Sequence, residues 1–184
     1  MLKDARIAIC LLASLVVGCS GRPATYSLAA RSSAKADNRW IRFRPSVGEA
    51  SVSLPTAPEE MPQPPVATPT HLYTCPRSAG GSFQFGVSTC KDEIIGEETR
   101  TFLERIKVGS VSRPHTKLLS EQFRIVAGLD AIEYTISTHQ DNTQIRYLVL
   151  LRGRHYYVLS SIGSAEQIAD QDSENFFNSV RFDN

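Results

Sequence analysis

The sequence predicts an α+β domain in which an antiparallel β-sheet meander carries packed helices. Apolar residues recur at every second position over 123–127 and alternate with polar residues over 132–136, which is the pattern of half-buried strands, and strand-like segments continue to residue 160. A stretch with helical periodicity precedes this meander and another follows it. Hydrophobic residues make up 41% of the 184 residues and charged residues 21%, a balance typical of a globular chain. We therefore expect one folded domain over residues 39–184.

Residues 1–18 have the pattern of a signal peptide. Lys3 and Arg6 precede an apolar run over residues 7–17, which is shorter than the about 20 residues that span a bilayer. The following segment Val16-Val17-Gly18-Cys19 resembles the lipobox of bacterial lipoproteins. This resemblance implies cleavage after Gly18, lipidation of Cys19 and an anchor of two or three acyl chains.

Two alternatives to a lipoprotein remain at this point: an ordinary secretory signal in which Cys19 is incidental, or an uncleaved anchor helix. Ser20 follows the cysteine, and the lipoprotein pattern then favours the outer membrane, facing the periplasm, over the inner membrane. The protein would thus lie in the cell envelope and contact the membrane through Cys19.

The segment 19–38 is rich in Ser, Ala, Arg and Gly and is predicted to be a flexible tether. Removal of residues 1–18 takes away Lys3, Arg6 and Asp4 and leaves basic and acidic side chains in equal number. A neutral chain gives no electrostatic reason to expect a nucleic-acid partner.

Cys75 and Cys90 remain for the folded domain. Paired cysteines of an exported protein usually form a disulfide, because the compartment is oxidising. Both lie at the ends of strand-like segments, 71–75 and 82–90, so we expect a hairpin closed by a Cys75–Cys90 bridge. A redox or metal role is the alternative, although the spacing is not that of a C-x-x-C motif.

The first elements of the domain are predicted as short strands at 40–43 and 50–54. The stretch 55–70 holds six prolines, PTAPEEMPQPPVATPT, and is expected to be an extended loop, because proline cannot enter a sheet interior. A proline-rich ligand for a partner protein is the alternative interpretation. After Cys90, apolar residues at helical spacing predict a helix that ends at Gly109.

Strands follow from Lys117 onward. The segment 145–151 is apolar on both faces and is predicted to be a central strand covered on both sides. Arg152-Gly153-Arg154 forms the expected hairpin turn to the next strand. A last helix is predicted to begin at Ser164, where Gln167 completes a capping box, and a short strand or tail follows over residues 180–182.

Three short segments resemble exported bacterial domains of the PsbP-like α/β/α sandwich superfamily. They are the patterns G-x-x-A-x-E at 128–133, G-R-x-Y-x-x-L at 153–159 and F-F-x-S-V-x-F at 176–182. The resemblance implies an α/β/α sandwich over residues 39–182. It also implies a non-enzymatic protein, since the characterised relatives are mostly non-enzymatic and share no catalytic residues that could be carried over.

No motif in the sequence points to catalysis. The four histidines have no metal-ligand spacing, and the chain has neither a G-x-S-x-G elbow nor a phosphate-binding loop. We therefore expect no catalytic residue, no metal and no cofactor.

Two groups are candidates for binding a partner. The first group is basic and surrounds one end of the meander; the alternative is that these residues simply form a solvated hairpin turn. The second group is a set of tyrosines on adjacent strands that could line a ligand face; the alternative is that they pack against one another across the strands. The basic group is Arg146, Arg152, Arg154 and His155, and the tyrosines are Tyr134, Tyr147, Tyr156 and Tyr157.

The sequence thus favours a non-catalytic, envelope-anchored lipoprotein that binds or assembles a protein partner. A carrier of a small ligand or lipid on the sheet face is the second hypothesis. An unrecognised hydrolase is the third.

Overall fold

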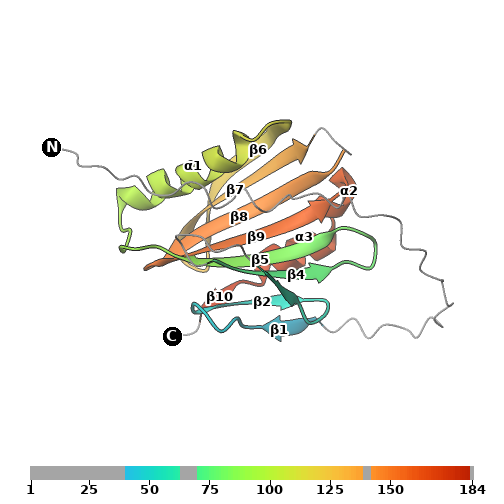
Figure 1. The fold of residues 1–184 in the computed structure, drawn as a ribbon, viewed down its shortest axis with the longest axis horizontal. Helices are drawn as coiled ribbons and strands as arrows, with labels where there is room; N and C mark the ends of the chain where they lie inside the picture. The colour runs from blue at the N-terminus through green and yellow to red at the C-terminus, as the bar shows by residue number, and fades with distance from the viewer. Residues whose placement is uncertain (1–39, 63–69, 139–141, 183–184) are drawn as a thin grey trace.

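The computed structural model describes residues 40–62, 70–138 and 142–182, which form two antiparallel sheets and three helices (Figure 1). In chain order the elements are β1 (Ile41–Phe43), β2 (Ala50–Leu54), β3 (Glu59–Met61), β4 (Thr70–Pro76), β5 (Ser82–Thr89), α1 (Glu97–Val111), β6 (Thr116–Val126), β7 (Leu129–Thr138), β8 (Gln144–Arg152), β9 (His155–Gly163), α2 (Ala165–Ile168), α3 (Gln171–Asn178) and β10 (Arg181–Phe182).

The larger sheet has seven strands in the order β3-β4-β5-β9-β8-β7-β6. Its second half is the predicted meander, in which β6 to β9 follow one another through hairpins. β8 lies inside the sheet and is buried from Tyr147 to Leu151, which confirms the prediction of a central strand. Gly153 adopts φ 58° in the turn that joins β8 to β9.

The smaller sheet joins the two ends of the domain. β2 pairs with β1 on one side and with β10 on the other, so Ser51 lies opposite Arg181. Arg42 strengthens this junction, because its guanidinium donates to the hydroxyl of Ser51 at 3.0 Å and to the carbonyl of Ser179 at 2.5 Å.

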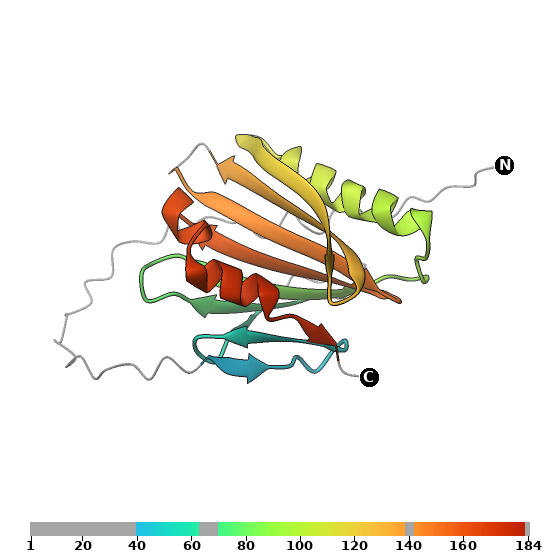
Figure 2. The ribbon, with the colours of Figure 1, turned by 180° about the vertical axis from the view of Figure 1, so that it is seen from behind.

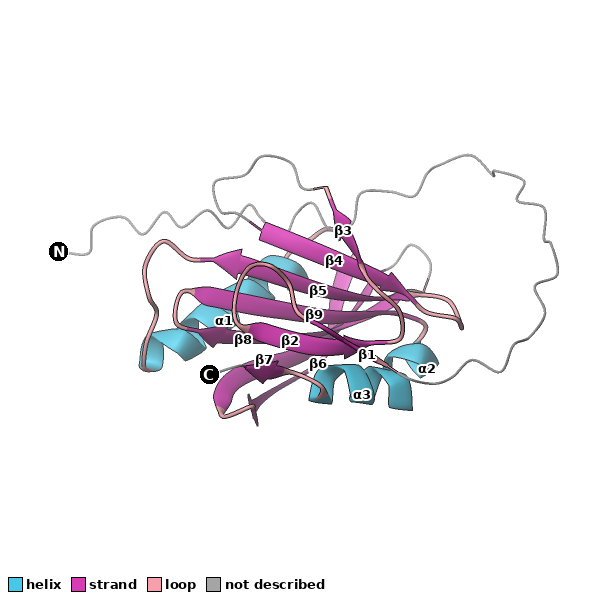
Figure 3. Cartoon of the chain, turned by 90° about the horizontal axis from the view of Figure 1, so that it is seen from below, coloured by secondary structure: helices cyan, strands magenta, loops and turns pink. Residues whose placement is uncertain are grey.

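Two apolar cores lie on opposite faces of the larger sheet. On one face α1 contributes Phe102 and Leu103 to the first core. On the other face α3 and the smaller sheet supply the second core, which includes Val52, Phe176 and Phe177. Figure 2 shows α3 lying across the face opposite α1, and in Figure 3, which looks from below, β1 and β2 lie in front of the larger sheet.

The helix ends follow local chemistry that the sequence shows only in part. α1 continues two residues past Gly109, which was predicted to end it. The capping box of Ser164 and Gln167 is confirmed, but α2 ends at Ile168. Asp170 then caps a new helix, because its carboxylate accepts a hydrogen bond from the backbone N–H of Ser173 at 2.9 Å.

The prediction of an α+β fold, and of a PsbP-like α/β/α sandwich, is wrong. Strands hold 51% of the described residues and helices hold 20%, so the chain has a mostly-sheet fold. The last predicted helix divides at Asp170 into two short ones. Strand also forms in the proline-rich stretch, where β3 adds to the edge of the sheet beside β4.

Several predicted features lie outside the described residues. They are the signal peptide, Cys19, the tether and the part of the proline-rich stretch at 63–69. Within the described ranges, no helix has the length and hydropathy needed to cross a membrane.

Candidate functional site

The four candidate tyrosines do not share a face. Tyr134 and Tyr147 stack at 4.9 Å between ring centroids beneath α1, and Tyr156 belongs to the same core. Tyr157 lies in the other core, where its hydroxyl accepts a hydrogen bond from the backbone N–H of Glu49 at 3.0 Å. All four are buried, so they pack the interior and do not line an open ligand face.

Burial changes the acidity of these phenols. Desolvation raises the pKa of Tyr147 to about 12, although the nearby Arg113 opposes the shift. Desolvation also raises the pKa of Tyr134, whose hydroxyl lies 2.9 Å from that of Ser110. Both phenols stay neutral over the physiological range.

The four candidate basic residues also separate. Arg146 is near the start of β8, while the other three surround the turn at its far end. Arg152 pairs with Glu49 at 3.3 Å, and Arg154 donates to the carbonyl of Cys90 at 3.2 Å. His155 lies 3.1 Å from the hydroxyl of Thr89. The four therefore form no single basic surface.

Arg146 belongs to an ion-pair network that fixes α3 to the sheet. It pairs with Glu133 of β7 at 2.7 Å and with Glu174 of α3 at 2.5 Å, and its guanidinium lies 4.8 Å from the centre of the Phe177 ring. Burial lowers the pKa of Arg146, but the two carboxylates outweigh this effect and raise it. Glu133 is only 6% exposed and also lies 3.0 Å from Arg124.

Arg77 forms a second network, which no pattern in the sequence indicates. Its side chain is 3% exposed and pairs with Asp170, the N-cap of α3. The same guanidinium donates to the hydroxyls of Ser161 and Ser173, both at 3.1 Å, and to the carbonyl of Gln167 at 2.8 Å. These contacts hold the two short helices against β9, so this network is structural.

The predicted Cys75–Cys90 disulfide is wrong, and both thiols are free. Cys75 lies opposite Phe83 near the start of β5, whereas Cys90 follows the last residue of that strand. Phe83 and Cys90 are seven residues apart in extended chain, so Cys90 lies about 23 Å along the strand from the position opposite Cys75. A disulfide needs Cα atoms about 4.4–6.8 Å apart. Burial raises the pKa of the Cys90 thiol, while Arg154 opposes the shift.

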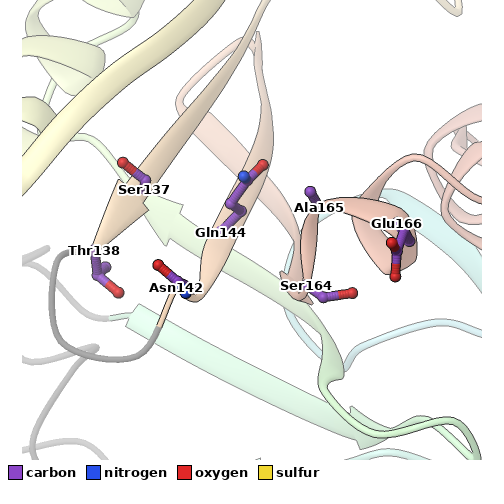
Figure 4. Close-up of a pocket in the computed structure, with 7 residues that line it drawn as sticks. All are labelled: Ser137, Thr138, Asn142, Gln144, Ser164, Ala165 and Glu166. Atoms are coloured by element: carbon purple, nitrogen blue, oxygen red, sulfur yellow. The ribbon is translucent and has the colours of Figure 1, made fainter.

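A polar pocket of about 350 Å³ lies where β7 and β8 meet the start of α2 (Figure 4). Its walls offer hydroxyls, amides and one carboxylate, which can hydrogen-bond a neutral polar group. Neighbouring strand ends and a helix start build it together, so no local motif could reveal it. It is lined by Ser137, Thr138, Asn142, Gln144, Ser164, Ala165 and Glu166.

The outer edge of β6 is another open feature. β6 ends the order of the larger sheet, and no strand of the described ranges pairs with its outer side. The ladder to β7 is regular from Ser120 to Val126, after a bulge at Leu119. Ile125 is 67% exposed and Leu119 is 44% exposed, so apolar side chains lie along this edge.

The hairpin turn determines which backbone groups of β6 face outward. Val126 pairs with Leu129 across a two-residue turn in which Ala127 and Gly128 have φ 50° and 81°. The residues that flank such a turn bond to each other, so the N–H and C=O of Val126 point to β7. Backbone groups of successive residues in a strand point to alternate sides. The N–H and C=O groups of Glu121, Phe123 and Ile125 therefore point outward, away from β7.

The side chains of these three residues lie on the α1 face of the sheet. Phe123 sits opposite Ile132 and packs against the core beneath α1, and the guanidinium of Arg100 lies 4.4 Å from the centre of its ring. Glu121 pairs at 2.6 Å with Lys107 of α1. Burial lowers the pKa of Lys107, but Glu104 and Glu121 outweigh this effect and raise it.

No metal site emerges among residues 40–62, 70–138 and 142–182, where no three His, Cys, Asp or Glu side chains come together to hold an ion. The open edge of β6 and the polar pocket are therefore two features of the described ranges that could meet a ligand or a partner. β3 and β1 also end their sheets, but each has only three residues, whereas β6 has eleven.

Comparisons with known proteins add little. No family model and no curated protein matches the chain. PA94 of Pseudomonas aeruginosa, a protein of unknown function, is similar in structure with a TM-score of 0.43 at 10% identity, over 70% of this chain and 85% of that one. A protein of Bacteroides thetaiotaomicron gives a TM-score of 0.46 at 11% identity, over 73% of this chain and 45% of that one. Likenesses this weak carry no argument about function.

Proposed function

We propose that the protein is a non-catalytic binding module of the cell envelope, anchored by lipid on Cys19, whose binding element is the open edge of β6. The observation that carries the proposal is the row of outward backbone groups at Glu121, Phe123 and Ile125. A row of free N–H and C=O groups on an edge strand is a template for another extended chain.

The edge has what strand addition requires. Main-chain hydrogen bonds supply affinity in this mode, and alternate side chains supply specificity. Phe123 and Ile125 offer apolar surface on one face. On the other face Gln122 offers a polar group, beside Arg124, which pairs with Glu133 at 3.0 Å. An added strand would therefore meet an apolar side and a polar side.

The networks of two arginines, Arg77 and Arg146, support this choice, because they are engaged in holding the fold. Arg77 is bound to Asp170, and Arg146 is bound to Glu133 and Glu174. A partner that displaced either set would have to break contacts between α3 and the sheet.

The expected anchor agrees with a binding role. A flexible tether of the length of segment 19–38 has an average reach of about 2–3 nm. The domain could thus orient its edge toward a partner while the lipid holds it at the membrane.

Photocrosslinking in intact cells tests the proposal. A photoreactive amino acid would replace Ile125, or as a matched control Val108, an apolar residue of α1 that is 54% exposed. We expect a discrete protein adduct from position 125 and none from position 108. Equal labelling at the two positions, or no adduct at position 125, would contradict the proposal.

A further inference from the structure

We infer that the strand added at β6 is β6 of a second copy of this chain, paired antiparallel about Phe123; this inference rests on the proposed function of the β6 edge. The two larger sheets would then form one continuous sheet across a two-fold axis. Such a pairing uses the same surface on both copies and therefore closes as a dimer.

The hydrogen-bond pattern selects the centre of the pairing. With Phe123 opposite itself, Glu121 of each copy lies opposite Ile125 of the other. All three residues direct their backbone groups outward, so each opposed pair exchanges two bonds, about six in total. A register centred on Gln122 leaves the outward groups of Ile125 facing the bulge at Leu119.

The side chains also agree with this centre. The two Phe123 rings are neighbours on the α1 face, and Ile125 of each copy lies diagonal to Phe123 of the other. On the opposite face Gln122 meets Arg124. Centring on Glu121 would oppose two carboxylates, and centring on Arg124 would oppose two guanidiniums, so like charges disfavour both of those registers.

Charge complementarity adds a contact between the copies. Arg100 lies over the ring of Phe123 and is exposed. In the register centred on Phe123, Glu121 of the second copy is diagonal to that ring and lies on the same face. The guanidinium of each copy thus approaches a carboxylate of the other, while Lys107 holds that carboxylate from its own helix.

Cysteine crosslinking of two tagged, full-length copies tests the inference. One copy would carry Glu121→Cys and the other Ile125→Cys, both with Cys90→Ser to remove a partly exposed native thiol. Paired residues of an antiparallel ladder have Cα atoms about 5.5 Å apart, within disulfide range. We expect a covalent dimer that contains both tags.

The controls are the two single-variant strains. Two Glu121→Cys copies place their sulfurs about four residues apart along the ladder, about 13 Å, so they should not bridge. Equal yields from mixed and single strains, or no mixed dimer, would overturn the inference. If position 125 photocrosslinks to a different protein while the mixed dimer is absent, the proposed function survives and the second copy is excluded.

Ile125→Pro gives an independent test. This change removes an outward N–H and spares the ladder to β7, since proline is tolerated where the N–H faces away from the sheet. Sedimentation of the full-length lipidated protein in detergent should show a concentration-dependent dimer for the wild type and a monomer for the variant. A wild-type monomer at all concentrations, or a variant that still dimerises, would contradict the inference.

Discussion

At the scale of single residues, Arg77 connects the end of β4 to the last two helices. Its guanidinium is buried and meets Asp170, two serine hydroxyls and a carbonyl. Its removal would take one donor from each of these groups and leave the carboxylate of Asp170 without its ion-pair partner, although Gln167 and Asp170 would still accept hydrogen bonds from Ser173.

Arg77→Ala is therefore expected to lower the free energy of unfolding by about 2–3 kcal/mol, at the low end for a buried pair because Asp170 is partly exposed. Urea denaturation followed by circular dichroism measures this change in the free energy of unfolding. Arg105→Ala, at an exposed position of α1, should change the value by less than about 0.5 kcal/mol. Equal effects would show that the Arg77 contacts add nothing.

Tyr147 should make the domain sensitive to alkali. Its phenol loses a proton near pH 10 in the unfolded chain and near pH 12 in the folded one. Between these values the unfolded state binds fewer protons, so stability falls as pH rises, by about 1.4 kcal/mol per pH unit. Urea midpoints measured from pH 9 upward should fall less steeply for Tyr147→Phe. Parallel curves for the two proteins would contradict the assignment.

Sequence patterns anticipated some of these residues and missed others. Tyr156 and Tyr157 are adjacent in the sequence and so lie on opposite faces of β9, although the prediction grouped them on one ligand face; only the packing of α1 shows that Tyr134 and Tyr147 are buried. Arg77 could not be found, because its partners lie more than 80 residues away along the chain.

At the scale of elements, β6 decides how the larger sheet ends. Only its second half alternates clearly in sequence, because most of the strand is exposed and few of its side chains, such as Leu118 and Phe123, pack against the core. The sequence therefore predicts the hairpin to β7 but not the full length of the open edge.

Proline substitutions can test which backbone groups of β6 point to β7 and which point outward. Gln122→Pro removes an N–H that bonds to β7, whereas Ile125→Pro removes one that points away. We expect Gln122→Pro to lower the unfolding free energy by about 1–3 kcal/mol more than Ile125→Pro does. Urea denaturation of both variants at low protein concentration measures the difference. A larger loss of unfolding free energy for Ile125→Pro would mean that the N–H of Ile125 bonds to β7 and that of Gln122 points outward.

The cysteines illustrate what strand patterns leave undetermined. Both flanking segments are strands, as predicted, and they pair antiparallel. The hairpin turn lies next to Cys75, however, so Cys90 comes at the far end of β5. The pairing register of β4 and β5, which the sequence does not define, thus keeps the two thiols apart.

At the scale of the whole molecule, sequence periodicity located most strands yet misjudged the balance of sheet and helix. The C-terminal pattern is helical throughout, but Asp170 starts a new helix within it. β10 then returns to pair with β2, a contact over more than 120 residues that no local signal encodes. The polar pocket likewise depends on elements that meet only in the folded chain.

The lipid anchor gives a prediction for the complete chain. We expect the wild type in the membrane fraction, with acyl chains on Cys19 detected by mass spectrometry of the N-terminal peptide. Cys19→Ser should prevent lipidation and leave the signal peptide uncleaved, because the thiol is the group that accepts the lipid. Recovery of the wild type in a soluble fraction with an unmodified cysteine would contradict the anchor.

The most direct test of the open edge is amide hydrogen exchange at single-residue resolution on the full-length lipidated protein. The N–H groups of Glu121, Phe123 and Ile125 should exchange fast in dilute detergent solution and become protected as the protein concentration rises, while those of Gln122 and Arg124 stay protected throughout. Concentration-dependent protection at these three residues alone would establish that the edge of β6 receives a strand of a second copy. Fast exchange at all three residues under every condition, also in membranes isolated from cells, would show that the edge binds no strand.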